Sequence, residues 1–139
     1  MRRARLLALT ALLVAAVSGC NSSPSEPSQI IPLTGTLAKS GATVTTVSLK
    51  DTGNMRIRAI ELQPLAADGT PVGGSSGIII NVGDGNENVC VAAGGFSFVQ
   101  GSVVSLGLQK GSYCLKLTEP GLVADDGSLR YNISLEITE

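Results

Sequence analysis

Residues 129–138 read LRYNISLEIT, a run in which apolar and polar side chains alternate without a break. Successive side chains of a β-strand point to opposite faces, so this pattern predicts a strand with one face in a hydrophobic core and the other in water. The stretch therefore favours an antiparallel sheet that is covered on one side. The predicted core face carries Leu129, Tyr131, Ile133, Leu135 and Ile137.

Seven shorter apolar-alternating runs precede this stretch, separated by turns rich in glycine and aspartate. No segment after Leu33 keeps a helical period for three turns. The sequence thus predicts one all-β domain over 33–139, an antiparallel β-sandwich or jelly roll of about eight strands. The predicted strands are Thr34–Leu37, Val44–Leu49, Met55–Leu62, Ile78–Val82, Phe96–Val99, Ser102–Leu108, Tyr113–Thr118 and Leu129–Thr138.

Residues 55–62 change phase within one predicted strand. Apolar side chains keep one parity as far as Ile57 and take the other from Ile60 onward. A slip of one residue reverses the faces of a strand, so we expect a bulge or bend near Ala59.

A short hairpin is predicted at Gln109-Lys110-Gly111, between two strand-like runs. Glycine at the end of such a connection supplies backbone conformations that other residues avoid.

Cys90 and Cys114 are predicted to form a disulfide, because the chain carries an export signal and exported proteins meet an oxidising compartment. Cys114 shares its parity with Lys116 and Thr118, so the bridge is expected on the outer face or rim rather than in the main core. The alternative is a pair of free, buried thiols.

The composition narrows the function. The chain has no histidine, which removes Ser-His-Asp and Cys-His catalysis and the usual zinc ligand. From residue 20 onward, seven basic and eleven acidic side chains give a net charge of −4, and the basic residues are scattered. Nucleic-acid binding, which needs clustered Lys and Arg, is therefore not expected.

The N-terminal segment has the three parts of an export signal. Basic residues lie at positions 2, 3 and 5, an apolar run covers 6–17, and small residues precede Cys20. This run is too short to span a bilayer. Residues 1–19 are therefore predicted to be a signal peptide, and residues 20–32, rich in Ser and Pro, a flexible tether.

Val17-Ser18-Gly19-Cys20 resembles the lipobox of bacterial lipoproteins. The resemblance implies a diacylglycerol thioether and a further acyl chain, such as palmitate, on Cys20, and hence a membrane anchor in the cell envelope. It further implies that Asn21 favours the outer membrane in an organism with two membranes. The alternative is an ordinary secretory signal with a chance cysteine at the cleavage site.

A second resemblance covers the domain from Leu33 to the end. Residues 33–37 (LTGTL), 111–117 (GSYCLKL) and 131–135 (YNISL), with Gly53 before a strand, are similar to the bacterial pre-peptidase C-terminal (PPC) domain. This resemblance implies a β-sandwich of the kind that is appended to exported enzymes. Residues 77–82 depart from the Asp-rich, aromatic middle strand that the family often carries.

Asp84, Asn86 and Asn88 place oxygen side chains at alternate positions, as calcium loops do. The EF-hand pattern fails, because Val89 and Gly95 stand where it needs glycine and glutamate. A solvated turn is the alternative, and it is also our interpretation of 125–127. No other metal or cofactor is predicted.

The aromatic and acidic residues nominate no catalytic or sugar-stacking group. Aromatic faces for sugar stacking would come from Phe96, Phe98, Tyr113 and Tyr131, which fit a core better. No spacing pairs the carboxylates Glu61, Asp84, Glu119 and Asp125 as a hydrolase would require.

The sequence thus favours a non-enzymatic, lipid-anchored envelope module that presents an interaction surface to an unknown envelope partner, a protein or a glycan. A glycan-binding or adhesion module, with or without calcium, is the alternative, and a carboxylate-dependent hydrolase is the remote one.

Overall fold

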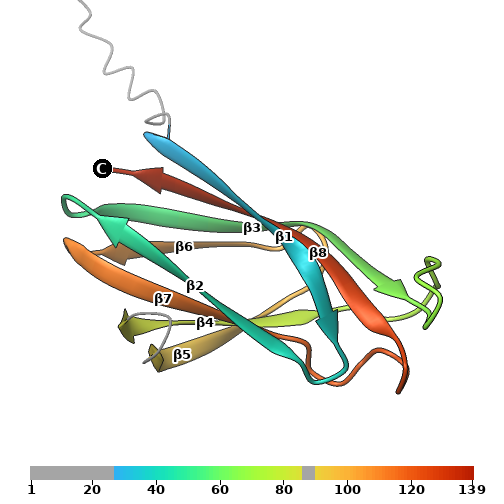
Figure 1. The fold of residues 1–139 in the computed structure, drawn as a ribbon. Helices are drawn as coiled ribbons and strands as arrows, with labels where there is room; N and C mark the ends of the chain where they lie inside the picture. Colours follow the sequence, from blue (N-terminus) through green and yellow to red (C-terminus); the bar gives the residue numbers. More distant parts are fainter. Residues whose placement is uncertain (1–26, 86–89) are drawn as a thin grey trace, which may run out of the picture.

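The computed structural model describes residues 27–85 and 90–139 and confirms the predicted all-β sandwich. Two four-stranded antiparallel sheets pack face to face (Figure 1). In the described residues the eight strands are β1 (Gln29–Ala38), β2 (Ala42–Leu49), β3 (Gly53–Leu65), β4 (Ile78–Gly85), β5 (Cys90–Phe98), β6 (Val103–Leu108), β7 (Gly111–Thr118) and β8 (Ser128–Thr138).

The strand order is that of a jelly roll. The first sheet runs β1-β8-β3-β6 and the second runs β2-β7-β4-β5, so most consecutive strands lie in different sheets. The hairpin predicted at 109–111 is therefore wrong. These residues carry the chain from β6 in the first sheet to β7 in the second, and β7 pairs with β2 and β4 instead.

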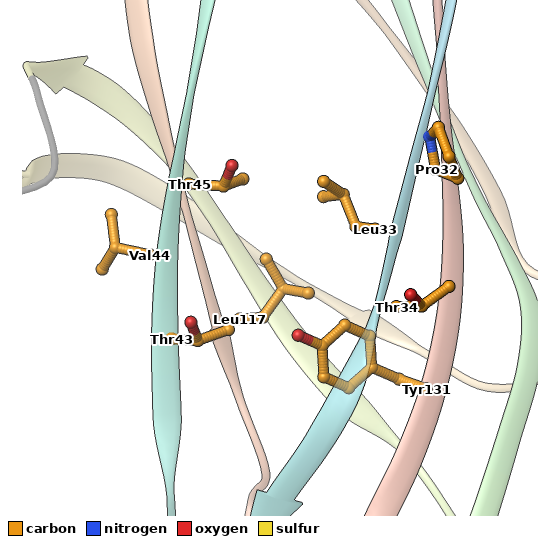
Figure 2. A pocket seen from close by; sticks show the side chains of 8 residues that line it. All are labelled: Pro32, Leu33, Thr34, Thr43, Val44, Thr45, Leu117 and Tyr131. Atoms are coloured by element: carbon orange, nitrogen blue, oxygen red, sulfur yellow. The ribbon is translucent and has the colours of Figure 1, made fainter.

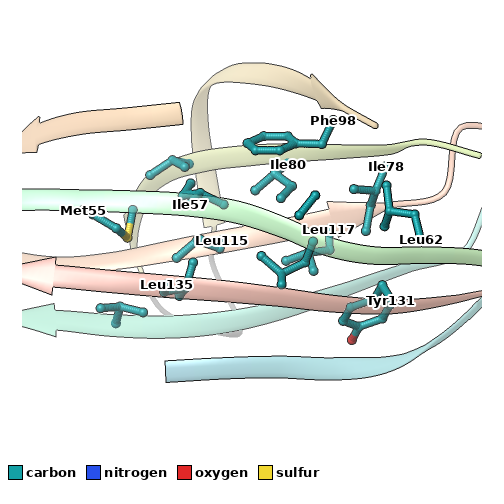
Figure 3. Packing of buried hydrophobic residues seen from close by; sticks show 14 of the residues in the cluster. Met55, Ile57, Leu62, Ile78, Ile80, Phe98, Leu115, Leu117, Tyr131 and Leu135 are labelled. Atoms are coloured by element: carbon teal, nitrogen blue, oxygen red, sulfur yellow. The ribbon is translucent and has the colours of Figure 1, made fainter. Parts of the chain in front are cut away.

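The core lies between the sheets and uses the predicted alternation. Ile133 and Leu135 of β8 are fully buried, and they face Leu115 and Leu117 of β7. Figure 3 shows side chains from β3 and β8 meeting those from β4 and β7 in one layer. Phe98 fills the core beside Ile78 and Ile80, so its ring is unavailable for sugar stacking.

The predicted bulge in β3 is confirmed. The pairing of β3 with β8 shifts register between Ala59 and Glu61. The extra residue, Ile60, points outward and is 48% exposed, whereas Leu62 returns to the core. The β5–β6 turn holds the bulge, since Ala59 N donates to Ser102 O (3.0 Å) and Gly101 N donates to Ala59 O (2.8 Å).

The predicted tether extended too far. β1 begins at Gln29, which pairs with Ile137, so residues 29–32 belong to the sheet and not to a flexible linker. The local composition suggested a linker, but the backbone of β8 provides a full set of partners. Pro32 fits this strand because it lies at a sheet edge, where its missing N–H costs no ladder hydrogen bond.

The predicted Cys90–Cys114 disulfide is present, with the two Cα atoms 5.7 Å apart. Cys114 is fully buried, yet it lies outside the main core cluster, on the face of β7 opposite to Leu115 and Leu117. Its Sγ lies 3.5 Å from the carbonyl oxygen of Gly83. The bridge therefore straps β5 to β7 on the outer face of the second sheet, as the parity of Cys114 predicted.

The two ends of the sandwich differ. Gln29 and Thr138 lie at one end, where the C-terminus is marked in Figure 1. Residues 66–77 and 119–127, the longest described connections, lie at the other end. The described residues include no helix with the length and apolar character that crossing a membrane requires.

Candidate functional site

A candidate site opens between β1 and β2, the neighbouring edge strands of the two sheets, and we call it the β1–β2 cleft. Its volume is about 290 Å³, at the lower limit for small-ligand pockets. Figure 2 shows Leu33, Leu117 and the Tyr131 ring between the two strands, with Thr43 and Thr45 reaching toward them from β2, whereas Val44 points away from β1. The cleft is lined by Pro32, Leu33, Thr34, Thr43, Val44, Thr45, Leu117 and Tyr131.

Gly35 makes room for the ring that forms one wall. It lies directly opposite Tyr131 in the β1–β8 ladder. A Cβ atom on Gly35 would lie 2.6 Å from the Tyr131 hydroxyl and 2.9 Å from the adjoining ring carbon, closer than real contacts allow. The missing side chain thus lets the tyrosine lie flat across β1 and reach the cleft.

The Tyr131 hydroxyl is a polar group in this wall. It points from β8 toward β2 in Figure 2, on the side where Thr43 and Thr45 lie. The residue is 8% exposed, and burial raises the pKa of its phenol. The Tyr113 hydroxyl donates to Gln109 O at 2.7 Å, whereas that of Tyr131 has no hydrogen bond within 27–85 and 90–139. It is available to a ligand.

The backbone of β2 borders the cleft and is open on one side. Glu119 N donates to Gly41 O at 2.9 Å, which makes this a hydrogen-bonded pair of the β2–β7 ladder. Bonded and non-bonded pairs alternate in an antiparallel ladder, so Ala42, Val44 and Thr46 direct their N–H and C=O groups away from β7.

β2 also lacks the devices that usually protect an edge strand. β1 carries Pro32, β6 has only six residues, and β5 is interrupted by a register shift opposite Val82 and Gly83. β2 has eight residues, no proline, no charge and no register shift. Its edge can therefore accept a further strand.

A buried carboxylate fixes the turn that leads into β2. Glu119 is 1% exposed and accepts hydrogen bonds from the backbone N–H of Ser40 (2.7 Å), Gly121 (2.8 Å), Leu122 (2.6 Å) and Val123 (3.2 Å). Burial opposes its ionisation, but the four donors outweigh burial and hold the pKa of Glu119 below its usual range. The cluster sets the position of the β1–β2 turn.

The other carboxylates considered for catalysis lie apart in structural roles. Glu61 accepts two hydrogen bonds from Arg130, at 2.8 and 3.1 Å. Asp125 pairs with Lys39, which lowers the pKa of the carboxyl and raises that of the amine. Asp84 is exposed at the end of β4. Within the described ranges, no three acidic, cysteine or histidine residues gather as metal ligands.

Several predicted site residues lie outside the described residues. These are the lipobox Val17-Ser18-Gly19-Cys20 and the calcium candidates Asn86 and Asn88. The turn predicted at 125–127 is confirmed, since Gly127 N donates to Ala124 O at 3.0 Å just before β8 begins.

Sequence reasoning did not identify the β1–β2 cleft. Two signals were present: a glycine at 35 on the core parity of β1, and threonines at 43 and 45 on the core parity of β2. Both break a hydrophobic face at positions where the two sheets separate. Glycine inside a strand commonly marks the close approach of another group.

Comparison with known proteins identifies the fold but no family. No family model and no curated protein matches the chain. PliG, a periplasmic inhibitor of g-type lysozyme from Aeromonas hydrophila, is 17% identical, with a TM-score of 0.53 over 78% of this chain and 86% of that chain. This likeness demonstrates a shared β-sandwich fold.

Two further solved structures are more distant. The Yersinia pseudotuberculosis-derived mitogen is 13% identical, with a TM-score of 0.47 over 81% of this chain and 86% of that one. The CBM36-1 domain of a xylanase from the hindgut metagenome of Trinervitermes trinervoides is 11% identical, with a TM-score of 0.38 over 80% and 96%.

Proposed function

We propose that this chain is a non-enzymatic, lipid-anchored module of the cell envelope that binds an extended segment of a partner protein along the edge of β2. The added strand would pair with the outward backbone groups of Val44 and Thr46. Alternate side chains of the partner would then enter the β1–β2 cleft and contact Leu33, Leu117 and Tyr131.

The observation that carries this proposal is the unprotected edge of β2. Exposed edges promote aggregation, and natural sheets usually block them with proline, charge, a bulge or short length. β2 has none of these, although β1 in the same molecule carries Pro32. An edge left open beside a cleft is a natural site for a partner strand.

The position in the cell is proposed from the sequence. Val17-Ser18-Gly19-Cys20 supports acylation of Cys20, and several acyl chains hold a protein to a membrane effectively permanently. The two longest described loops lie at the end opposite Gln29, so an N-terminal anchor would leave them free. Asn21 favours the outer membrane, if there is one.

The fold is compatible with action by binding. PliG, which has a similar sandwich, is by its description a periplasmic inhibitor of g-type lysozyme, so a sandwich of this kind can act on another protein. The likeness is one of fold, and the choice of a peptide partner rests on β2.

The test is a quantitative pull-down from solubilised envelopes with the full chain. Val44→Pro removes an outward N–H and obstructs strand addition, and proline is tolerated on an edge strand. Val44→Thr is the matched control, because it keeps both the N–H and the β-branched shape. We expect a defined protein that the wild type and Val44→Thr retain and Val44→Pro loses. Recovery of the same proteins with all three baits would refute the β2 proposal.

A glycan in the β1–β2 cleft is the second candidate, favoured by the hydroxyls of Thr43, Thr45 and Tyr131. If a glycan is the ligand, binding on a glycan array should be lost in Tyr131→Phe and kept in Val44→Pro. Chelator-sensitive binding would point instead to calcium near Asp84.

Anchoring is tested independently. Cys20→Ser is expected to abolish incorporation of labelled palmitate and to release the domain into the soluble fraction, while Cys90 and Cys114 still form their disulfide. A wild-type product with the mass of the bare polypeptide would contradict lipidation.

A further inference from the structure

A second hollow lies away from the β1–β2 cleft, on the outer face of the first sheet, and we call it the arginine hollow. Its volume is about 400 Å³. Its walls include Arg58, Ile60, Gly101, Val103, Ser134 and Glu136.

The ladder registers explain how the hollow forms. Arg58 of β3 lies directly between Val103 of β6 and Ser134 of β8. Ser134 is small and 7% exposed, so it forms a low floor beside the longer arginine. Ile60, pushed outward by the bulge, and Val103 are 48% and 42% exposed and form an apolar wall.

Arg58 has unused hydrogen-bonding capacity at this point. Its Nε is buried and has no hydrogen-bond partner in the part of the chain that the structure describes; Oε1 of Glu136 lies 3.5 Å away. Glu136 also pairs with Arg56, at 3.5 Å. Two guanidinium groups thus share one carboxylate at long distance, which leaves a net positive charge beside a buried donor.

The same face concentrates the arginines of the domain. From residue 20 onward the arginines are Arg56, Arg58 and Arg130, and all three lie on β3 and β8 of the first sheet. Glu61 and Glu136 offset two of the three charges. The rest of an otherwise acidic domain would repel an anionic partner, so this face is where such a partner fits best.

From this arrangement we infer that the arginine hollow binds an acidic peptide segment that carries an aliphatic side chain next to a carboxylate. The carboxylate pairs with the guanidinium group of Arg58, whose side chain is 41% exposed, and accepts a hydrogen bond from the Ser134 hydroxyl. The aliphatic side chain packs against Ile60 and Val103. The bulge is pinned by the β5–β6 turn, so the apolar wall is formed before the peptide binds.

The inference is independent of the β2 proposal, because the arginine hollow lies on the outer face of the first sheet, whereas the β2 edge belongs to the second sheet. The hollow and the β1–β2 cleft share no lining residue. Either can fail without the other.

The test is an NMR titration of the full chain in nonionic detergent with two probes, acetyl-Leu-Asp-Leu-amide and acetyl-Leu-Asn-Leu-amide. We expect saturable shifts of the Ile60, Val103 and Ser134 amides with the aspartate peptide. The asparagine peptide should bind about tenfold more weakly, since it lacks the charge.

Variants separate the parts of the site. Arg58→Gln is expected to lower the affinity for the aspartate peptide about tenfold. Ile60→Ser changes an exposed side chain that the fold does not need and should lower this affinity about threefold. Arg130→Gln is the matched control on the same face and should leave affinity within about twofold. Equal affinity for the two peptides, shifts centred elsewhere, or no saturation by about 10 mM peptide would overturn the inference.

Discussion

The carboxylate of Glu119 accepts a hydrogen bond from the backbone N–H of Ser40 at 2.7 Å, across 79 residues of sequence. Ser40 lies in the β1–β2 turn with a left-handed φ of 55°, a conformation that serine rarely adopts. The other three donors come from residues 121–123, so one buried side chain joins two loops at the end of the sandwich far from Gln29.

Glu119→Gln is expected to destabilise the fold by about 2 kcal/mol at pH 7, because an amide cannot accept all four hydrogen bonds and brings its own N–H groups toward donors. Urea denaturation measures this. Glu61→Gln, at an exposed ion pair, should change stability by about 0.5 kcal/mol or less.

The same variant should alter the response to acid. The pKa of Glu119 is lowered in the fold, so its contribution is complete above the unfolded value of 4.5 and is lost as pH falls through the folded value. Wild-type stability should therefore fall below pH 4.5, and more steeply than that of Glu119→Gln. Some loss should persist in the variant, since Asp68 and Asp125 also have lowered pKa values. Parallel curves would contradict this role for Glu119.

Gly35→Ala is expected to destabilise the fold by about 1–3 kcal/mol, because the new methyl group overlaps the Tyr131 ring. Tyr131→Leu removes that ring and should itself be destabilising. In the Tyr131→Leu background, Gly35→Ala should lower the free energy of unfolding by far less than it does in the wild-type protein. Thermal unfolding of all four proteins gives the coupling. Additive effects would mean that the ring does not lie over Gly35.

Tyr131 should ionise late. In a Tyr113→Phe protein only one tyrosine remains, and its absorbance titration should have a midpoint above 10, since burial disfavours the phenolate. The unfolded chain loses this proton first, so stability should decline as pH rises above about 10. A midpoint at or below 10 would indicate a solvated side chain.

Reduction of Cys90–Cys114 should lower stability by about 3 kcal/mol, because the bridge closes a long loop in the unfolded chain. The Cys90→Ala/Cys114→Ala protein should be less stable by a similar amount and indifferent to dithiothreitol. If dithiothreitol lowered the stability of both proteins equally, its effect would not arise from the disulfide.

Local sequence patterns predicted the strands well because alternation is a local property. The LRYNISLEIT stretch became β8, and the phase change after Ile57 became the bulge at Ile60. Side-chain parity also placed Cys114 on the outer face. Each of these inferences needed only neighbours within a few residues.

Long-range pairing was not accessible in the same way. The break at 109–111 looks like a hairpin locally, but β6 and β7 find their partners in different sheets. The hydrogen bonds of Glu119 were inaccessible for the same reason. Three of its donors, residues 121–123, are close to it in sequence, but Ser40 is not. The β1–β2 cleft likewise depends on Gly35 and Tyr131, which meet only after β1 pairs with β8.

The shared end of Gln29 and Thr138 guides the engineering of this molecule. A fluorescent protein or affinity tag fused after Glu139 would lie beside the N-terminal end of the sandwich and leave the opposite end unobstructed. A short epitope is better inserted within 66–77, where the chain is largely exposed and lies at the end of the sandwich opposite to Gln29 and Thr138. Antibody access to such an epitope on intact cells would then report which way the domain faces.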